Sequence, residues 1–380
     1  MSKETTVITL GCRLNAYESE VMAGHALDSG LENSIIINTC AVTKEAVRSS
    51  HHAIRKAKKE NPKCNIIVTG CAAQINPEAF SKMSEVDVVI GNNEKMIAAN
   101  FEPDNLMLGN PIKVNDIMSV KELAPQLISG GNRNFTKTQN RTRAFLQIQN
   151  GCDHRCTFCI IPYGRGQARS TPAGSVVSHV QSLVLQGYKE IVLTGVDLSS
   201  WGQDLPRKPP LGDLIKRILK LVPNLPRLRL SSIDPAEIDQ ELFTALSTEK
   251  RITPYLHLSL QSGDNMILKR MKRRHNREEV ISLCKKLKSL RPEFTFGADI
   301  IAGFPTESDA MFENSKNIIK EIGIPWLHVF PYSAHEGTPA EKMPQIENST
   351  IKLRAKILRE QGELVKLMHL KSRIGTKDFA

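Results

Sequence analysis

Short β-branched runs alternate with helix-like stretches along the first ninety residues. The runs, rich in valine, isoleucine and threonine, cover residues 6–10, 35–37, 66–68 and 86–90. The segments between them, such as 16–29 and 44–60, have a composition and length that suit helices. This alternation predicts an α/β fold with an open parallel sheet and crossover helices.

The alternation resumes from residue 143 and predicts a second parallel α/β region. Its six candidate strands are residues 144–148, 190–193, 228–230, 255–258, 298–301 and 326–330. Six strand–helix units predict a partial (β/α)6 barrel, and barrels of parallel strands carry their sites at the carboxyl ends of the strands. The polar stretch 119–142 separates the two regions and is predicted to be a linker.

Composition favours two domains and an anionic partner. A chain of 380 residues is too long for one ordinary domain, and its 40% hydrophobic residues are enough to bury substantial cores. The net charge of +11 favours nucleic acid, although a generally basic solvated surface would explain the charge equally well. No apolar stretch is long enough to span a membrane, and the first residues lack the apolar core of a signal peptide. We therefore expect a cytoplasmic protein without a membrane partner.

Three cysteines lie close together in the second region, in the pattern C-x3-C-x2-C with Phe158 before the last. Three thiols on one loop can hold three irons of a 4Fe-4S cluster and leave the fourth iron open. Zinc is an alternative, since His154 lies inside the loop, but structural zinc usually draws its ligands as two separated pairs. A disulfide is less favoured because cytosolic thiols stay reduced.

Three further cysteines each follow one of the first three predicted strands. They are Cys12, Cys40 and Cys71. Because the carboxyl ends of parallel strands share one edge of a sheet, these thiols can converge there. A lone cysteine is more often a small buried apolar residue, and Cys64 and Cys284 fit that description.

Around both sets of cysteines the sequence resembles the radical S-adenosylmethionine (SAM) methylthiotransferases. The resemblance rests on residues 149–166 around the loop and on the blocks LGCRLN at 10–15, NTCAVT at 38–43 and TGCAAQ at 69–74. Ala72 replaces a tyrosine that many relatives have, a change that we expect to be tolerated. The resemblance implies two 4Fe-4S clusters, one held by Cys152, Cys156 and Cys159 and the other by Cys12, Cys40 and Cys71.

The chemistry that the resemblance implies is the insertion of a methylthio group at an unactivated carbon. A radical derived from SAM takes hydrogen from the substrate, and the second cluster holds the sulfur, which another SAM has methylated. No acid or base side chain could remove such a hydrogen near neutral pH, so we expect no catalytic residues beyond the cluster ligands.

The resemblance also implies which residues contact SAM. The loop 194–197 corresponds to the place where the family binds the methionine amino group, and other positions line the adenine or meet the sugar. Asp234 precedes Pro235 and suits a turn equally well. The expected SAM contacts are Phe158, Thr194, Gly195, Val196, Asp197, Ser232, Asp234, Gln261, Asp299, Gly303, Val329 and Phe330.

Four segments, at 256–263, 268–274, 328–333 and 337–340, most resemble one subgroup of the family. That subgroup methylthiolates carbon 2 of N6-threonylcarbamoyladenosine at position 37 of tRNA, beside the anticodon. The alternatives are an isopentenyladenosine in tRNA, an aspartate of a ribosomal protein, or a non-catalytic iron-sulfur or RNA-binding protein. The expected partners are tRNA and an electron donor such as a flavodoxin or ferredoxin.

Two basic runs agree with an RNA partner, although a solvated helix face would explain either run as well. The candidate phosphate contacts are Arg48, Arg55, Lys56, Lys269, Arg273 and Arg274. Relatives end in a small β-barrel RNA-binding module after a long helix, and we expect that module to be largely absent here. The predicted segments are therefore an amino-terminal domain over 1–118, a linker over 119–142, a radical SAM barrel over 143–348, and a helix with a remnant of the module over 349–380.

Overall fold

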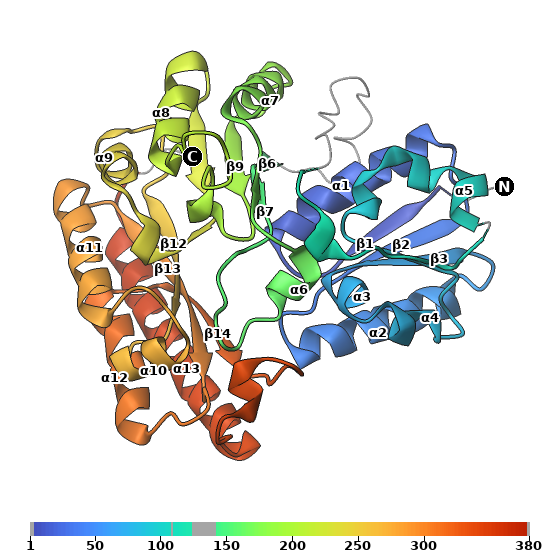
Figure 1. The fold of residues 1–380 in the computed structure, drawn as a ribbon. Coiled ribbons are helices and arrows are strands. Elements are labelled where there is room, and N and C mark those ends of the chain that lie inside the picture. Colours follow the sequence, from blue (N-terminus) through green and yellow to red (C-terminus); the bar gives the residue numbers. More distant parts are fainter. Residues whose placement is uncertain (1–3, 108, 124–141, 378–380) are drawn as a thin grey trace. The chain divides into compact units, whose positions relative to one another are not determined.

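The computed structural model describes residues 4–107, 109–123 and 142–377 (Figure 1). The chain forms two compact units, of which the first comprises Met1–His154, Cys159–Pro210 and Arg217–Arg227 and the second comprises the remainder. Most of the predicted linker, residues 124–141, lies outside the described residues. In the part of the chain that the structure describes, no helix is long and apolar enough to cross a membrane.

A five-stranded parallel sheet forms the core of the first unit and confirms the predicted open sheet. Its strands follow one another in sequence order: β1 (Thr6–Thr9), β2 (Ser34–Thr39), β3 (Asn65–Gly70), β4 (Val88–Ile90) and β5 (Ile112–Lys113). Figure 1 shows helix α1 on one face of this sheet and helices α2 and α4 on the other. The helices of this part are α1 (Arg13–Asp28), α2 (Lys44–Glu60), α3 (Cys71–Ile75), α4 (Pro77–Ser81) and α5 (Pro103–Met107).

Burial on both faces explains the run of three isoleucines in β2. Ile36 packs with Met22 of α1, whereas Ile37 points to the opposite face and packs with Ile54 of α2. A strand covered on both faces has no polar side to expose, so its sequence does not alternate. Helix α2 begins at its predicted position because the Thr43 side chain accepts a hydrogen bond from the backbone N–H of Ala46.

The first unit also includes part of the predicted barrel. Strands β6 (Arg143–Gln147) and β9 (Glu190–Thr194) pair in parallel, and Phe145 and Val196 pack against Leu14 and Tyr17 of α1. This packing groups both strands with the amino-terminal sheet, which differs from the predicted domain limit at residue 143. The other elements here are β7 (Gln149–Asn150), α6 (Ile161–Arg165), β8 (Arg169–Ser170) and α7 (Ala173–Leu185).

A four-stranded parallel sheet forms the core of the second unit. Its strands are β11 (Ser232–Ile233), β12 (Tyr255–Gln261), β13 (Thr295–Ala302) and β14 (Trp326–Pro331). Alternate residues of β13, such as Phe296 and Ala298, are fully buried, whereas Asp299 lies on the other face and is partly exposed. Helices pack around this sheet: α9 (Gln240–Thr248), α10 (Asn265–Arg270), α11 (Arg277–Leu290), α12 (Asp309–Ile322) and α13 (Asn348–Arg373).

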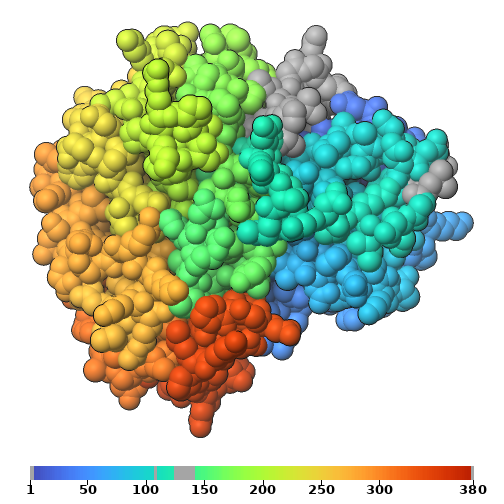
Figure 2. All heavy atoms as spheres, in the orientation of Figure 1, coloured from blue at the N-terminus to red at the C-terminus, as the bar shows by residue number. Residues whose placement is uncertain are grey.

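All six strands predicted for the second region are present, and at least one helix follows each of them. Helix α8 (Leu211–Leu221) and strand β10 (Arg227–Leu230) complete the set. Figure 2 shows the atoms of α11 and α12, coloured orange, on the outer surface of the second unit, where charged residues such as Lys285 and Lys286 of α11 are exposed. Among the described residues, α13 is the last helix or strand.

Glycines at the ends of β1 and β3 have backbone angles that side chains rarely allow. Gly70 has a φ of 99°, and a Cβ atom there would lie 2.3 Å from the carbonyl oxygen of Thr39. Gly11 has a φ of 93°, and its Cβ would lie 2.9 Å from the Sγ atom of Cys40. These glycines therefore permit the close approach of the loops at this edge of the sheet.

We predict that Gly70→Ala lowers the free energy of unfolding by about 3 kcal/mol or more, because backbone strain and a clash with the Thr39 backbone add together. Gly30→Ala is the matched control, since Gly30 also has a positive φ of 66° but has no atom within 4 Å of the added methyl group. That control is expected to lose only about 1 kcal/mol. Equal losses in chemical denaturation would contradict the role of the Thr39 contact.

Candidate active site

Three thiols converge at the carboxyl edge of the amino-terminal sheet. Cys12 immediately precedes α1, Cys40 follows β2, and Cys71 is the first residue of α3. Burial raises the pKa of the Cys40 thiol to about 12, and the nearby thiols of Cys71 and Cys12 add to this rise. The Cys40 thiol is therefore protonated on its own, and a metal that binds it must displace the proton.

A buried charge cluster, which we define as Glu18, Lys95 and Arg165, contacts Cys71. The Nε atom of Arg165 donates a hydrogen bond to the Sγ atom of Cys71 over 3.1 Å. The same guanidinium binds both carboxylate oxygens of Glu18, and the Lys95 ammonium lies 2.7 Å from Glu18 Oε2. The exposed fraction of each of the three residues is 1% or less.

Neutral amides surround the buried charge cluster. Lys95 donates to the side-chain oxygens of Asn92 at 2.7 Å and Asn38 at 3.3 Å, and Arg165 donates to that of Asn15. Burial alone would raise the pKa of Glu18, but the charges of Arg165 and Lys95 outweigh burial and lower it. The carboxylate is therefore held in its charged form.

Helix α6 directly follows one set of cysteines in the chain and packs against α3, which carries a cysteine of the other set. Cys152, Cys156 and Cys159 lie on the loop between β7 and α6, and each is partly exposed. Arg165 is six residues after Cys159, so the two residues lie no more than roughly 22 Å apart. Arg165 itself donates a hydrogen bond to Cys71. At Gly164 an added Cβ would lie 3.3 Å from the carbonyl oxygen of Cys71, which shows how closely α6 packs against α3.

The loop after β9 lies against the segment that carries Cys152. Its contact with SAM stays a prediction. The Cys152 thiol donates to Asp197 Oδ2 over 3.6 Å, and His154 Nε2 lies 2.9 Å from the same oxygen. The backbone N–H of Asp197 donates to the side chain of Gln149. His154, which could have been a fourth zinc ligand, thus interacts with a carboxylate. Thr194 is buried, whereas Gly195 and Val196 are partly exposed.

In the second unit, Arg273 and Asp234 form an internal ion pair. Arg273 Nη2 donates to Asp234 Oδ2 at 2.9 Å, and Arg273 Nη1 lies 3.6 Å from Cys156 Sγ. Burial alone would raise the pKa of Asp234, but the imidazole of His275, 3.5 Å from Oδ1, and the charge of Arg273 hold it well below its ordinary value. Arg274 also contacts Asp234, at 3.3 Å. These contacts favour a structural role for Arg273 and Asp234 over the RNA and SAM contacts predicted for them.

Several other residues predicted to contact SAM lie near the carboxyl ends of the strands in the second unit. Phe158 packs with Phe304 edge to face, with ring centroids 6.4 Å apart, and Phe330 belongs to the same apolar group. Gln261 ends β12, and Gly303 follows β13 with a φ of 73°. Ser232 is exposed and Val329 is partly exposed.

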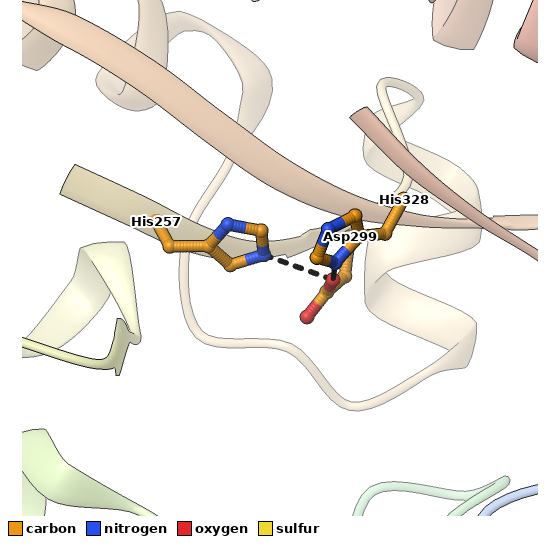
Figure 3. A group of neighbouring side chains, drawn as sticks. All are labelled: His257, Asp299 and His328. Atoms are coloured by element: carbon orange, nitrogen blue, oxygen red, sulfur yellow. Dashed lines mark hydrogen bonds and ion pairs between the residues drawn. The ribbon is translucent and has the colours of Figure 1, made fainter. Parts of the chain in front are cut away.

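Asp299 lies within β13, where two imidazoles point at its carboxylate (Figure 3). His257 Nε2 and His328 Nδ1 lie 2.9 and 3.2 Å from Asp299 Oδ1. Burial alone would raise the pKa of Asp299, but the two histidine hydrogen bonds lower it to about 2. The three ligand atoms lie within 4.8 Å of one another, which would suit a divalent ion, but both imidazoles already share hydrogen bonds with Asp299 Oδ1.

Sequence reasoning missed this trio, although strand register could have found it. Asp299 and His328 are direct neighbours on β13 and β14, and His257 is opposite Gly297. A Cβ at Gly297 would lie 2.5 Å from His257 Nδ1, so the glycine makes room for the imidazole.

Two family matches cover most of the chain. Residues 4–91 match the uncharacterized protein family UPF0004, and residues 146–319 match the radical SAM superfamily. A threonylcarbamoyladenosine tRNA methylthiotransferase of Rickettsia prowazekii is 56% identical over 94% of this chain and 82% of its own length. The chain belongs to the radical SAM methylthiotransferase family.

A more distant relative agrees with this assignment, and a solved structure shares the fold. A tRNA-2-methylthio-N(6)-dimethylallyladenosine synthase of Shouchella clausii is 32% identical over 90% of this chain and 66% of its own length. A solved structure of the radical SAM methyltransferase TsrM from Kitasatospora setae has a TM-score of 0.62 and covers 89% of this chain and 75% of its own. Because its identity is only 14%, that likeness shows a shared fold alone.

Radical SAM methylthiotransferases use SAM and two 4Fe-4S clusters, and the cysteines of this member fit both clusters. One set of three thiols lies on a single loop, as an open cluster needs. The other set meets at one edge of a sheet beside a buried cation, which favours anionic sulfur.

Basic side chains are exposed in both units. On α2 these are Arg48, Arg55 and Lys56, and in the second unit they are Lys269 and Arg274. Arg48 forms only an exposed ion pair with Glu45, which is too weak to compete with a phosphate partner. Binding of RNA by these residues stays a prediction.

We predict that Asp299→Asn lowers the free energy of unfolding by about 2 kcal/mol near neutral pH, because two imidazoles lose a charged acceptor. The pKa of Asp299 is depressed, so its contribution is complete above the ordinary value of 3.8 and disappears as pH falls toward about 2. Urea denaturation of the cluster-free chain at several pH values would measure this difference.

Asp309→Asn is the control, because that carboxylate pairs with Arg354 but its side chain is 98% exposed. It is expected to change stability little at any pH. A penalty for Asp299→Asn that stays constant from pH 6 to about pH 2 would refute the titration argument.

Proposed function

We propose that this protein transfers a methylthio group to carbon 2 of N6-threonylcarbamoyladenosine at position 37 of tRNA. The observation that carries the proposal is the convergence of Cys12, Cys40 and Cys71 beside α6, the helix that directly follows the cysteine loop. Two open clusters, one held by the loop before α6 and the other beside α6, suit a reaction that joins sulfur to a carbon radical. The 56% identity to a threonylcarbamoyladenosine tRNA methylthiotransferase supports the choice of substrate.

The protein's own residues would bind and shield the reacting groups. When bound, SAM and the clusters supply the radical and sulfur chemistry. Cys152, Cys156 and Cys159 would hold the cluster that binds SAM, with Asp197 orienting the segment around Cys152. The apolar group that includes Phe158 would exclude water near the strand ends of the second unit.

The tRNA would be positioned through its phosphates and recognised at its adenine. Exposed cations such as Arg55 and Lys56 on α2 can neutralise phosphates without reading sequence. The target base would leave its stack to reach the clusters. We further propose a cytoplasmic location, where tRNA is modified, and a flavodoxin or ferredoxin as the electron donor.

Mass spectrometry of tRNA nucleosides tests the substrate. The chain would be expressed in a host that lacks its own methylthiotransferases, and we expect the methylthio form of N6-threonylcarbamoyladenosine to appear. Accumulation of a methylthio isopentenyladenosine instead would favour the alternative tRNA substrate. No methylthio nucleoside despite two loaded clusters would contradict action on tRNA and direct attention to a ribosomal protein.

A second prediction separates the two clusters. Cys71→Ala should reduce iron from about eight to about four atoms per chain and abolish methylthio transfer, because one cluster loses a ligand. Reductive cleavage of SAM should persist at the other cluster.

Cys64→Ala is the matched control, since Cys64 is also buried but precedes β3, at the opposite end of that strand from Cys71. It should leave iron content, cleavage and transfer unchanged. Transfer that survives in Cys71→Ala would show that the amino-terminal cysteines do not hold the sulfur-bearing cluster.

A further inference from the structure

The buried charge cluster of Glu18, Lys95 and Arg165 carries one positive charge more than it carries negative charge. Its two cations and one carboxylate are each no more than 1% exposed, and the amides around them are neutral. An excess charge buried this way is costly unless an anion lies next to it. The Cys71 sulfur, 3.1 Å from Arg165 Nε, is placed to be that anion when it is a metal-bound thiolate.

The side chain of Arg165 is held in place by its buried neighbours. Glu18 binds the guanidinium through two oxygens, and Lys95 contacts one of these oxygens, Oε2, at 2.7 Å. Asn92 ties Lys95 to α6, because its side chain accepts from Lys95 and donates to the carbonyl oxygen of Gly164. The Nε–H group of Arg165 therefore points at one ligand sulfur with little freedom to move.

We propose that Arg165 is a positioning residue that raises the reduction potential of the amino-terminal cluster through its hydrogen bond to the Cys71 sulfur. This inference rests on the proposed function, because it requires Cys12, Cys40 and Cys71 to hold that cluster. Reduction adds one electron, taken from a low-potential donor, and makes the cluster more negative. A cation bonded to a ligand sulfur stabilises the more negative state, and hydrogen bonds to sulfur are among the determinants of cluster potential.

The sign of the effect differs among the three charges of the buried charge cluster. Removing Arg165 or Lys95 takes away positive charge and should lower the potential, with the larger change for Arg165 because it touches the sulfur. Removing the charge of Glu18 leaves the cations unopposed and should raise the potential. A purely structural role predicts no such ordering.

The test uses the 380-residue chain with Cys152, Cys156 and Cys159 replaced by alanine, so that only the amino-terminal cluster is loaded. A potentiometric titration followed by electron paramagnetic resonance gives the midpoint for the parent, Arg165→Gln, Lys95→Met and Glu18→Gln. At the parent midpoint, Arg165→Gln should lower the ratio of reduced to oxidised cluster at least tenfold, which is a shift of about 59 mV to more negative potential. Lys95→Met should shift the midpoint potential less and in the same direction, and Glu18→Gln should shift it in the opposite direction.

Arg165→Gln leaves Glu18 and Lys95 as a neutral pair, so we expect this variant to fold and load iron. A midpoint unchanged by Arg165→Gln, or a shift of Glu18→Gln in the same direction as Lys95→Met, would overturn the proposal. If Arg165→Gln loses its iron, opposite shifts of the other two variants support the proposal and equal signs overturn it. A parent chain that binds no cluster would instead refute the ligand assignment on which the proposed function depends.

Discussion

The buried ion pair between Glu18 and Arg165 is the interaction on which the arrangement of the site depends. It joins α1, near the start of the chain, to α6, which follows the cysteine loop. Both charges are shielded from water, and loss of the Glu18 carboxylate would leave the Arg165 and Lys95 cations uncompensated in the interior. The pair therefore keeps α6 against Cys71, and with it the chain segment that carries Cys159.

The parts of the molecule that follow local rules were predictable from sequence. The open sheet and the convergence of Cys12, Cys40 and Cys71 follow from the rule that parallel strands end at one edge. Burial on both faces produced the isoleucine run of β2, and α2 spans the predicted residues 44–60. The six strands of the second region were also predictable, because each is a short apolar run that precedes a helix.

Features that depend on distant partners were not predictable in this way. Arg165 is 147 positions from Glu18, and no spacing in the sequence relates the two. Arg273 was expected to face RNA because it lies in a basic run, yet its neighbours Asp234 and Ser259 come from other elements and bury it. The pairing of Asp299 with His328 needs the register of two strands, which composition does not supply.

Helix α6 makes the length of the segment between Cys159 and Arg165 as important as its composition. One residue added there would turn Arg165 by about 100° around the helix axis and carry its Nε–H group away from Cys71. Side chains such as Tyr163, which is 53% exposed, leave room for substitution at a fixed length. The segment should therefore drift in sequence while it resists insertions and deletions, a pattern set by helical rotation rather than by any single side chain.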